Sequence, residues 1–353
     1  MASEQRSEHE PMNSATAPLP MPHGKAKIAL VAFSSLGDGL IYLMMAENLR
    51  NNGYDVTTFG KIAYQIRHWL PQLAIQPYPA PEEFDAALAG YDLVIMSPPQ
   101  FIRDRMDEAR TDEMRRKWLL ICQKCPSSWH FDHTERIRDK RDAETFEALR
   151  GLLDCSGSIR FREFTDESVV AITLEYMRHK MHLRDVDKQV ALTPPAGLQH
   201  RRHRQRIVVS PDSAWAEKKN WPPRDFLRLC HTLKERGYDP KIVVAPANHE
   251  RWAKRAGTVF ETPQFHDIGQ LSAYLYESGA VIANDSGNGH LASFLGVPVV
   301  TLYRKQNPNF HWRPDWGPGK VVCPRLTLPW IKGRIWKPFI SPADIIAALE
   351  TLP

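Results

Sequence analysis

The sequence predicts an α/β protein built from two doubly wound, Rossmann-like halves that face each other across a cleft. Two observations support this class. Short apolar runs alternate with helical patterns, which is typical of parallel sheets covered by helices, and this alternation is interrupted once, at residues 193–206, by Pro-Pro, a glycine and a basic run. The length of 353 residues also fits two domains of ordinary size.

The first half opens with a predicted βαβ unit. The apolar run Lys27–Phe33 predicts a strand, residues 34–39 a turn, Leu40–Asn51 a helix and Asp55–Phe59 the next strand. Tyr91–Met96 is a further buried strand, because it is short and almost wholly apolar.

The second half repeats the pattern. Strands are predicted at Ile207–Ser210, Lys241–Ala245, Ala280–Ala283 and Val299–Tyr303, and helices at Asp225–Arg236, His249–Arg255 and Pro342–Leu349. The carboxyl ends of such strands are where open α/β sheets bind ligands, so we place the site in the cleft between the halves.

These patterns predict the domain boundaries. Residues 1–25 are rich in Ser, Glu, Pro and Met, lack the apolar core of a signal peptide and read as a disordered tail. The N-terminal domain is expected at 26–192, with weakly periodic, charged helices over 98–165. The linker is 193–206, the second domain 207–340, and the helix in 341–353 could pack back on the N-terminal domain.

Composition limits the cellular setting. The formal charge of +5 is mild for this length and is equally compatible with anionic small molecules and an acidic membrane surface, while it does not by itself indicate nucleic acid. No stretch has the apolar length of a membrane span. Five cysteines are too few for a disulfide scaffold, so a cytoplasmic location is expected, and peripheral association with the inner face of the inner membrane stays open.

One pair of cysteines has the spacing of metal ligands. Cys122 and Cys125 are separated by two residues, and His130, His133 and Cys155 follow. Isolated motifs of this kind are weak signals, so unrelated thiols are the favoured interpretation.

The segment from Asn284 to Leu291 reads as the end of a strand, a polar turn and the start of a helix. Ser286 and the amides of Gly287 and Asn288 suit phosphate oxygens, because a helix start presents free N–H groups. Asp285 suits an amide or hydroxyl, and His290, one turn on, could donate to the same ligand. The alternative is a capped, buried helix with a packed histidine.

Two further segments point into the predicted cleft. After the strand at 207–210, Ser213 and the lysines 218 and 219 can donate charge-assisted hydrogen bonds to phosphate, although a surface lysine pair would look the same. After the first strand, Asp38 lies in a glycine-flanked turn that lacks the Gly-x-Gly-x-x-Gly fingerprint. It could act as a general base or cap a helix.

Together these segments resemble glycosyltransferase family 9, the ADP-heptose:lipopolysaccharide heptosyltransferases, in order over about residues 27–350. Asp285-Ser286-Gly287, His290-Leu291-Ala292 and Leu295–Val300 look like the donor-site signature of the family. Lys219-Asn-Trp221-Pro222 matches its Lys-x-Trp-Pro element, and residues 34–38 match the element that carries its catalytic aspartate.

The resemblance implies a GT-B fold and an inverting, metal-independent transfer of a heptose-type sugar from a nucleotide-diphosphate donor, ADP-heptose above all, to a hydroxyl of a lipopolysaccharide or other glycan. It implies no cofactor, metal or nucleic acid. The resemblance implies that Asp38 is the general base. It implies that Lys219, Ser286 and Gly287 bind the diphosphate, with Ser213 a weaker match. Asp285 and His290 would position the rest of the donor.

Acceptor-loop candidates are Ser35, Gly37, Gly39, Arg103 and Arg105. The chain departs from the family at Arg304–Pro308, where Gly-Pro-Thr is usual, and after Met96, where an aspartate and a basic acceptor segment are frequent. Two alternatives stay open. One is a GT-B relative of other chemistry, an epimerase or hydrolase, which would need extra acids in the cleft. The other is a non-catalytic nucleotide-sugar binding module with no role for Asp38.

Overall fold

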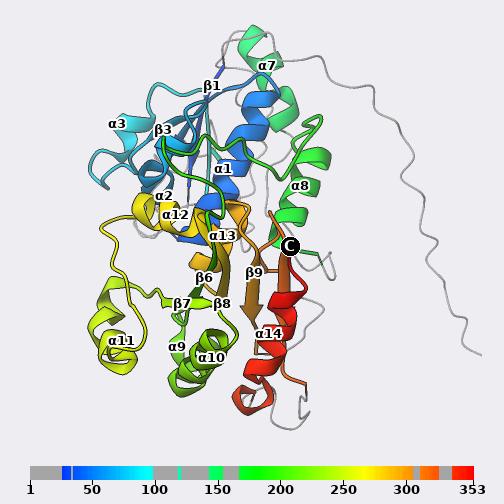
Figure 1. Cartoon of the computed structure of the whole chain (residues 1–353). Coiled ribbons are helices and arrows are strands. Elements are labelled where there is room, and N and C mark those ends of the chain that lie inside the picture. The colour runs from blue at the N-terminus through cyan, green and yellow to red at the C-terminus, as the bar shows by residue number, and fades with distance from the viewer. Residues whose placement is uncertain are drawn as a thin grey trace, which may run out of the picture.

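A computed structural model describes residues 26–32, 35–97, 118–120, 143–153, 167–304, 311–325 and 336–353. Within these residues the chain forms two five-stranded parallel sheets, one from each half of the sequence, with helices packed on both. Figure 1 shows the blue and cyan N-terminal half above the yellow, orange and red C-terminal half. No helix of the described part is long and apolar enough to cross a membrane.

The N-terminal sheet has the strand order β3-β2-β1-β4-β5. Its strands are β1 (Lys27–Val31), β2 (Asp55–Phe59), β3 (Ala74–Gln76), β4 (Leu93–Met96) and β5 (Trp118–Leu120). The described helices of this half are α1 (Leu36–Asn51), α2 (Lys61–Gln65), the 3₁₀ turn Arg67–Trp69, α3 (Phe84–Leu88), α7 (Ala143–Leu153) and α8 (Val169–His179).

The C-terminal sheet has the order β10-β9-β8-β6-β7. Its strands are β6 (His203–Ser210), β7 (Asp239–Ile242), β8 (Ser278–Asn284), β9 (Val299–Leu302) and β10 (Gly319–Val322). The helices are α9 (Ala216–Lys219), α10 (Pro223–Glu235), α11 (His249–Ala256), α12 (Ile268–Tyr276), α13 (Gly287–Phe294) and α14 (Pro342–Glu350), with 3₁₀ turns at Pro246–Asn248 and Lys337–Phe339.

The two halves share one buried apolar cluster. Leu43 and Leu49 of α1 belong to it together with Leu291 of α13 and Leu275 of α12, and all four are fully buried. Helix α1 is therefore buried along most of its length, in keeping with the apolar run that predicted a helix here. This contact fixes the starts of α1 and α13 relative to each other.

Helix α1 begins at Leu36, four residues before the predicted start. Ser35 is its N-cap, because the Ser35 Oγ accepts a hydrogen bond from the amide of Asp38 at 3.4 Å. Gly37, Asp38 and Gly39 thus lie in the first helical turn and not in a free loop. The alternative in which Asp38 is the N-cap is wrong, since the serine three residues earlier fills that position.

Two other expectations in the C-terminal half need correction. Strand β6 begins at His203, so residues 203–206 of the expected linker extend the strand, and the side chain of Arg206 is held there by the Ser278 hydroxyl at 2.9 Å. Helix α14 packs on α10 and the C-terminal sheet rather than on the N-terminal domain, because Ile345 and Leu349 bury their side chains in that sheet's core.

Several predictions fall outside the described residues. They are the tail at 1–25, most of the helices expected over 98–165, the acceptor-loop candidates Arg103 and Arg105, and the cysteines 122 and 125.

Candidate active site

The predicted site segments follow strands that flank the points where each sheet reverses its order. In the N-terminal sheet that point lies between β1 and β4, and in the C-terminal sheet between β6 and β8. Asp38 follows β1, Ser213 follows β6, and Asp285 follows β8. Ligands of open α/β sheets bind outside the carboxyl ends of strands at such positions.

The starts of α1 and α13 meet directly. A Cβ added to Gly287 would lie 2.8 Å from the Cβ and 2.9 Å from the Cδ2 of Leu36, which real side chains do not tolerate. A Cβ added to Gly37 would lie 3.5 Å from the ring of His290. Position 287 therefore needs a glycine for the two halves to come this close, and the segments at residues 35–38 and 285–290 form one site.

Asp38 is held by its neighbour Ser35. The Ser35 hydroxyl donates to Oδ2 of Asp38, and the same hydroxyl oxygen accepts from the Asp38 amide. Burial raises the pKa of the Asp38 carboxyl above its usual range, while the bond from Ser35 acts in the opposite direction. A partly desolvated carboxylate fixed at a helix start is well suited to accept a proton.

Lys219 and Asp285 are paired. The Lys219 Nζ lies 2.6 Å from Oδ2 of Asp285, and their side chains are 31% and 15% exposed. Burial raises the pKa of the Asp285 carboxyl, and the hydrogen bond and charge of Lys219 oppose this rise. The lysine predicted to meet the donor diphosphate is thus already oriented by an acid at the end of β8, and the pair is open enough for an anion to approach it.

Ser286 and His290 carry polar atoms that lack partners. Ser286 is the N-cap residue of α13, yet its side chain makes no capping bond, and its Oγ is buried without a hydrogen-bond partner among the described residues. The same is true of Nδ1 of His290, which is only 4% exposed. Buried polar atoms are nearly always satisfied, so this helix start has polar atoms available for a ligand that the described residues do not bond.

His290 is packed by aromatic rings. The rings of Trp312 and Trp316 meet it edge-on at centroid distances of 6.3 and 6.0 Å. Burial, with a smaller contribution from the positive charge of Lys219, lowers the pKa of His290 to about 4. The imidazole is therefore neutral near pH 7 and can donate one hydrogen bond without adding positive charge.

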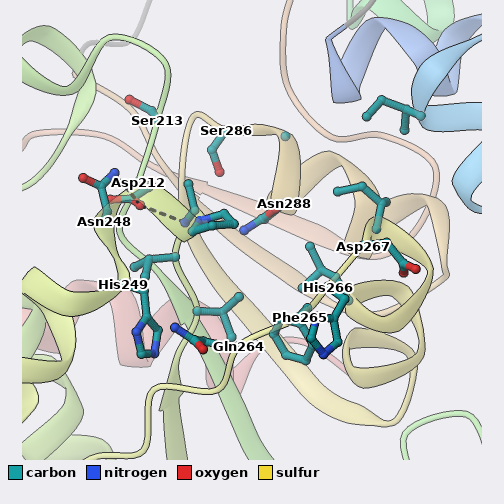
Figure 2. A pocket seen from close by; sticks show the side chains of 18 of the residues that line it. Asp212, Ser213, Asn248, His249, Gln264, Phe265, His266, Asp267, Ser286 and Asn288 are labelled. Atoms are coloured by element: carbon teal, nitrogen blue, oxygen red, sulfur yellow. Dashed lines mark hydrogen bonds between the residues drawn. The ribbon is translucent and has the colours of Figure 1, made fainter. Parts of the chain in front are cut away.

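A cavity of about 680 Å³ adjoins the start of α13 (Figure 2). Ser286, Gly287 and Asn288 line it, and so does Ser213, whose hydroxyl donates to Oδ1 of Asn220 at 2.5 Å. The other lining residues are Ile62, Gln65, Asp212, Ala214, Val243–Pro246, Asn248, His249, Gln264–Ile268 and Leu271.

Sequence reasoning missed most of this cavity. Asp212 is next to the predicted Ser213, but its carboxylate is used inside the protein, where Oδ2 accepts from the Ala245 amide and from Nδ2 of Asn248, both at 3.0 Å. Ile62 comes from the N-terminal half. No pattern along the chain could have indicated its place, since it depends on how the halves pack.

In the described part of the chain, no group of three or more His, Cys, Asp or Glu side chains is arranged to hold a metal ion.

Comparison with known proteins finds a family to which the second half of this chain is similar. The family model of glycosyltransferase family 9 (heptosyltransferase) matches residues 164–325, the stretch that contains the Lys219, Asp285 and His290 elements. The resemblance predicted from the sequence is confirmed. The matched residues include the donor-site motifs on which the resemblance rests.

Individual relatives agree with this assignment. Lipopolysaccharide heptosyltransferase 1 of Pseudomonas aeruginosa is 29% identical over 108 residues, which is 30% of this chain and 30% of that protein. Lipopolysaccharide heptosyltransferase 2 of Escherichia coli is 26% identical over 119 residues, 30% of this chain and 33% of that protein. The sequence matches thus span about a third of the curated relatives.

The fold extends over nearly the whole chain. The structure of ADP-heptose lipopolysaccharide heptosyltransferase II of E. coli superposes with a TM-score of 0.61 at 16% identity, and the match covers 92% of this chain and 98% of that one. The predicted GT-B fold is confirmed.

Proposed function

We propose that this chain is an inverting glycosyltransferase that moves a heptose-type sugar from a nucleoside-diphosphate donor, ADP-heptose, to a hydroxyl of a lipopolysaccharide or other glycan. The observation that carries the proposal is the contact between the starts of α1 and α13, where Leu36 lies against Gly287. This contact brings the helix start that carries the candidate base Asp38 next to the helix start that carries the unsatisfied Ser286 hydroxyl.

The proposed reaction is a single displacement. The acceptor hydroxyl gives its proton to the Asp38 carboxylate as its oxygen forms a bond to the anomeric carbon of the donor. The bond between that carbon and the diphosphate oxygen breaks, and the nucleoside diphosphate leaves with the electron pair. Lys219, the Ser286 hydroxyl and the free amides at the start of α13 stabilise the negative charge that develops on the leaving group.

The neutral His290 donates a hydrogen bond to the donor in this scheme. Its pKa of about 4 means that it carries no positive charge near pH 7. Asp285 keeps Lys219 in place, and Ser213 lies at the rim of the nucleotide cavity.

The described acids favour transfer over the alternatives. An epimerase or hydrolase would need a further acid in the cleft, but the described candidates are occupied. Asp212 binds Ala245 and Asn248, Asp285 pairs with Lys219, and Asp267 caps α12 by accepting from the Gln270 amide. Among the described residues, Asp38 is bonded by Ser35 of its own helix start and lies beside the start of α13, so it is the acid that we expect to take the proton.

A location at the cytoplasmic face of an acidic membrane, where a glycolipid acceptor would be presented, belongs to this proposal and is supported by the charge of +5.

The test is a donor screen with purified protein that measures release of ADP, UDP and GDP in the presence of a deacylated lipopolysaccharide acceptor, run alongside Asp38→Asn. We expect the protein to release ADP only when the acceptor is present. In Asp38→Asn this release should fall about 10²–10⁴-fold while the affinity for ADP stays unchanged. Asn has nearly the shape of Asp but is not a base, so near-normal turnover of this variant would exclude Asp38 as the base. Release of nucleotide without any acceptor would indicate a hydrolase.

A further inference from the structure

We infer that Gln65, a residue of the N-terminal half, hydrogen-bonds to the nucleobase of the donor in a cavity lined mostly by the C-terminal half. The inference rests on the proposed function, because it assigns a role within the nucleotide site. Gln65 is the last residue of α2 and lines the 680 Å³ cavity together with Ile62 one turn before it.

The side chain of Gln65 is fixed across the junction between the halves. Its Oε1 accepts a hydrogen bond from the amide of Ile268 at 2.9 Å, and Ile268 is the first residue of α12. This amide is one of the N–H groups at a helix start that have no partner within the helix. The backbone supports the same contact, since a Cβ added to Gly269 would lie 2.9 Å from the carbonyl oxygen of Gln65.

This bond also settles which way the amide group points. A backbone N–H can only donate, so the atom that meets it must be the oxygen of the glutamine and not the nitrogen. The NH₂ group of Gln65 is therefore held in a known orientation with two donors. No acceptor among the described residues is bonded to it, while the side chain belongs to the cavity wall.

The position of Gln65 identifies the part of the donor that it meets. Figure 2 separates Ser286, at the phosphate end of the cavity, from Phe265 and His266, which lie toward the other end. Gln65 is bonded to Ile268, at the end of that second segment. Ile268 and Leu271 of α12 line the cavity as well and add apolar surface to it, as a flat, buried base requires.

An amide NH₂ at this point would donate to a ring nitrogen or carbonyl oxygen of the base. A donor nucleotide would then bind fully only when the two halves are together, since one of its base contacts comes from the domain that also carries Asp38. Loss of one neutral hydrogen bond that is replaced by water corresponds to a fall in affinity of about tenfold or less.

The experiment compares two variants with a matched control. Gln65→Glu keeps an oxygen for the Ile268 amide but removes both donors, and Gln65→Met removes them without adding charge. Gln270→Glu makes the same chemical change nearby, on α12, where the Gln270 Oε1 accepts from the His266 amide at 3.1 Å and the side chain does not line the cavity. Calorimetry gives the affinity for ADP, UDP and GDP, and competition gives the affinity for inorganic pyrophosphate.

We expect both Gln65 variants to bind the preferred nucleoside diphosphate about tenfold more weakly than the parent protein, with unchanged affinity for pyrophosphate, and Gln270→Glu to bind both ligands normally. Unchanged nucleotide affinity in the Gln65 variants, or an equal loss for nucleotide and pyrophosphate, would overturn the assignment to the base. If the parent protein binds none of the three nucleotides, the proposed function fails first, and this inference fails with it.

Discussion

The contact between Leu36 and Gly287 predicts a sharp effect of Gly287→Ala. The added methyl group would lie 2.8 Å from Cβ, 2.9 Å from Cδ2 and 3.1 Å from Cγ of Leu36, well inside normal contact. Because the clash includes the Cβ of Leu36, whose position is set by the backbone, a side-chain rotation alone cannot relieve the strain. The start of α13 must move away from the start of α1, and with it the Ser286 hydroxyl must move away from Asp38.

The expected cost follows from this overlap. Insertion of a methyl group into a packed contact costs about 1–3 kcal/mol, and the better helix propensity of alanine returns at most about 1 kcal/mol. A net loss of about 1–2 kcal/mol in the assembled site corresponds to a fall in kcat/KM of roughly 5- to 30-fold.

Gly289→Ala is the matched control, because it adds the same methyl group two residues further along the same helix. Its nearest neighbour there would be the Cβ of Ala283 at 3.5 Å, an ordinary contact. Gly289→Ala should therefore retain activity. In the Gly287→Ala background, Leu36→Gly should restore part of what was lost, because it removes all three clashing atoms.

The assay is a double-mutant cycle in kcat/KM for nucleotide release, with thermal unfolding of each variant measured alongside. We expect a coupling energy of about 1 kcal/mol or more between positions 36 and 287, as is usual for residues in contact. We would reject the idea that this contact brings the two segments together if Gly287→Ala kept full activity. The same holds if Gly289→Ala lost as much activity as Gly287→Ala, or if Leu36→Gly gave no rescue.

Three other predictions concern the chemistry. Lys219→Ala should weaken binding of the nucleoside diphosphate, measured by calorimetry, by about 1.5–3 kcal/mol, the range for a charge-assisted hydrogen bond; unchanged affinity would remove Lys219 from the site. Turnover should persist in EDTA, since Lys219 and the start of α13 can carry the diphosphate charge; activity lost in chelator and restored by a divalent ion would contradict this. Burial raises the pKa of Asp38 from its usual value, and the base must be ionised, so kcat/KM should fall as the pH is lowered through that raised pKa; the same acid limb in Asp38→Asn would exclude this assignment.

The sequence predicted the elements of the fold well where buried runs are short and apolar. Strands β1, β4, β8 and β9 lie where such runs are found. Ends of elements were predicted less well, and α1 shows why. Glycines at 37 and 39 favoured a turn on propensity, but the Ser35 cap and burial against α13 extend the helix through them. Tertiary packing overrides weak local preferences of this size.

The site residues were likewise predicted in part: their identities could be predicted from the sequence, but their contacts could not. The sequence motifs identified Asp38, Lys219 and Ser286 as candidate site residues, because each follows a predicted strand or lies near a predicted helix start. They did not reveal that Lys219 would pair with Asp285 or that Ser35 would hold Asp38. Both facts are pairwise contacts, and a sequence pattern carries no direct signal of them.

The structure gives a second physical reason why position 287 of the donor motif is a glycine. Sequence reasoning assigned Gly287 to phosphate, because its amide lies at a helix start. The contact with Leu36 adds that the same position must lack a side chain for the halves to meet. The cavity also depends on both halves, because Gln65 of the N-terminal half lines it together with residues of the C-terminal half. Two domains that must each hold one substrate gain specificity when a site is complete only in their assembled state, since a donor bound there is already beside the base. In this chain the residues that join the halves, Leu36, Gln65 and Gly287, are therefore as much a part of the proposed active site as the charged groups between them.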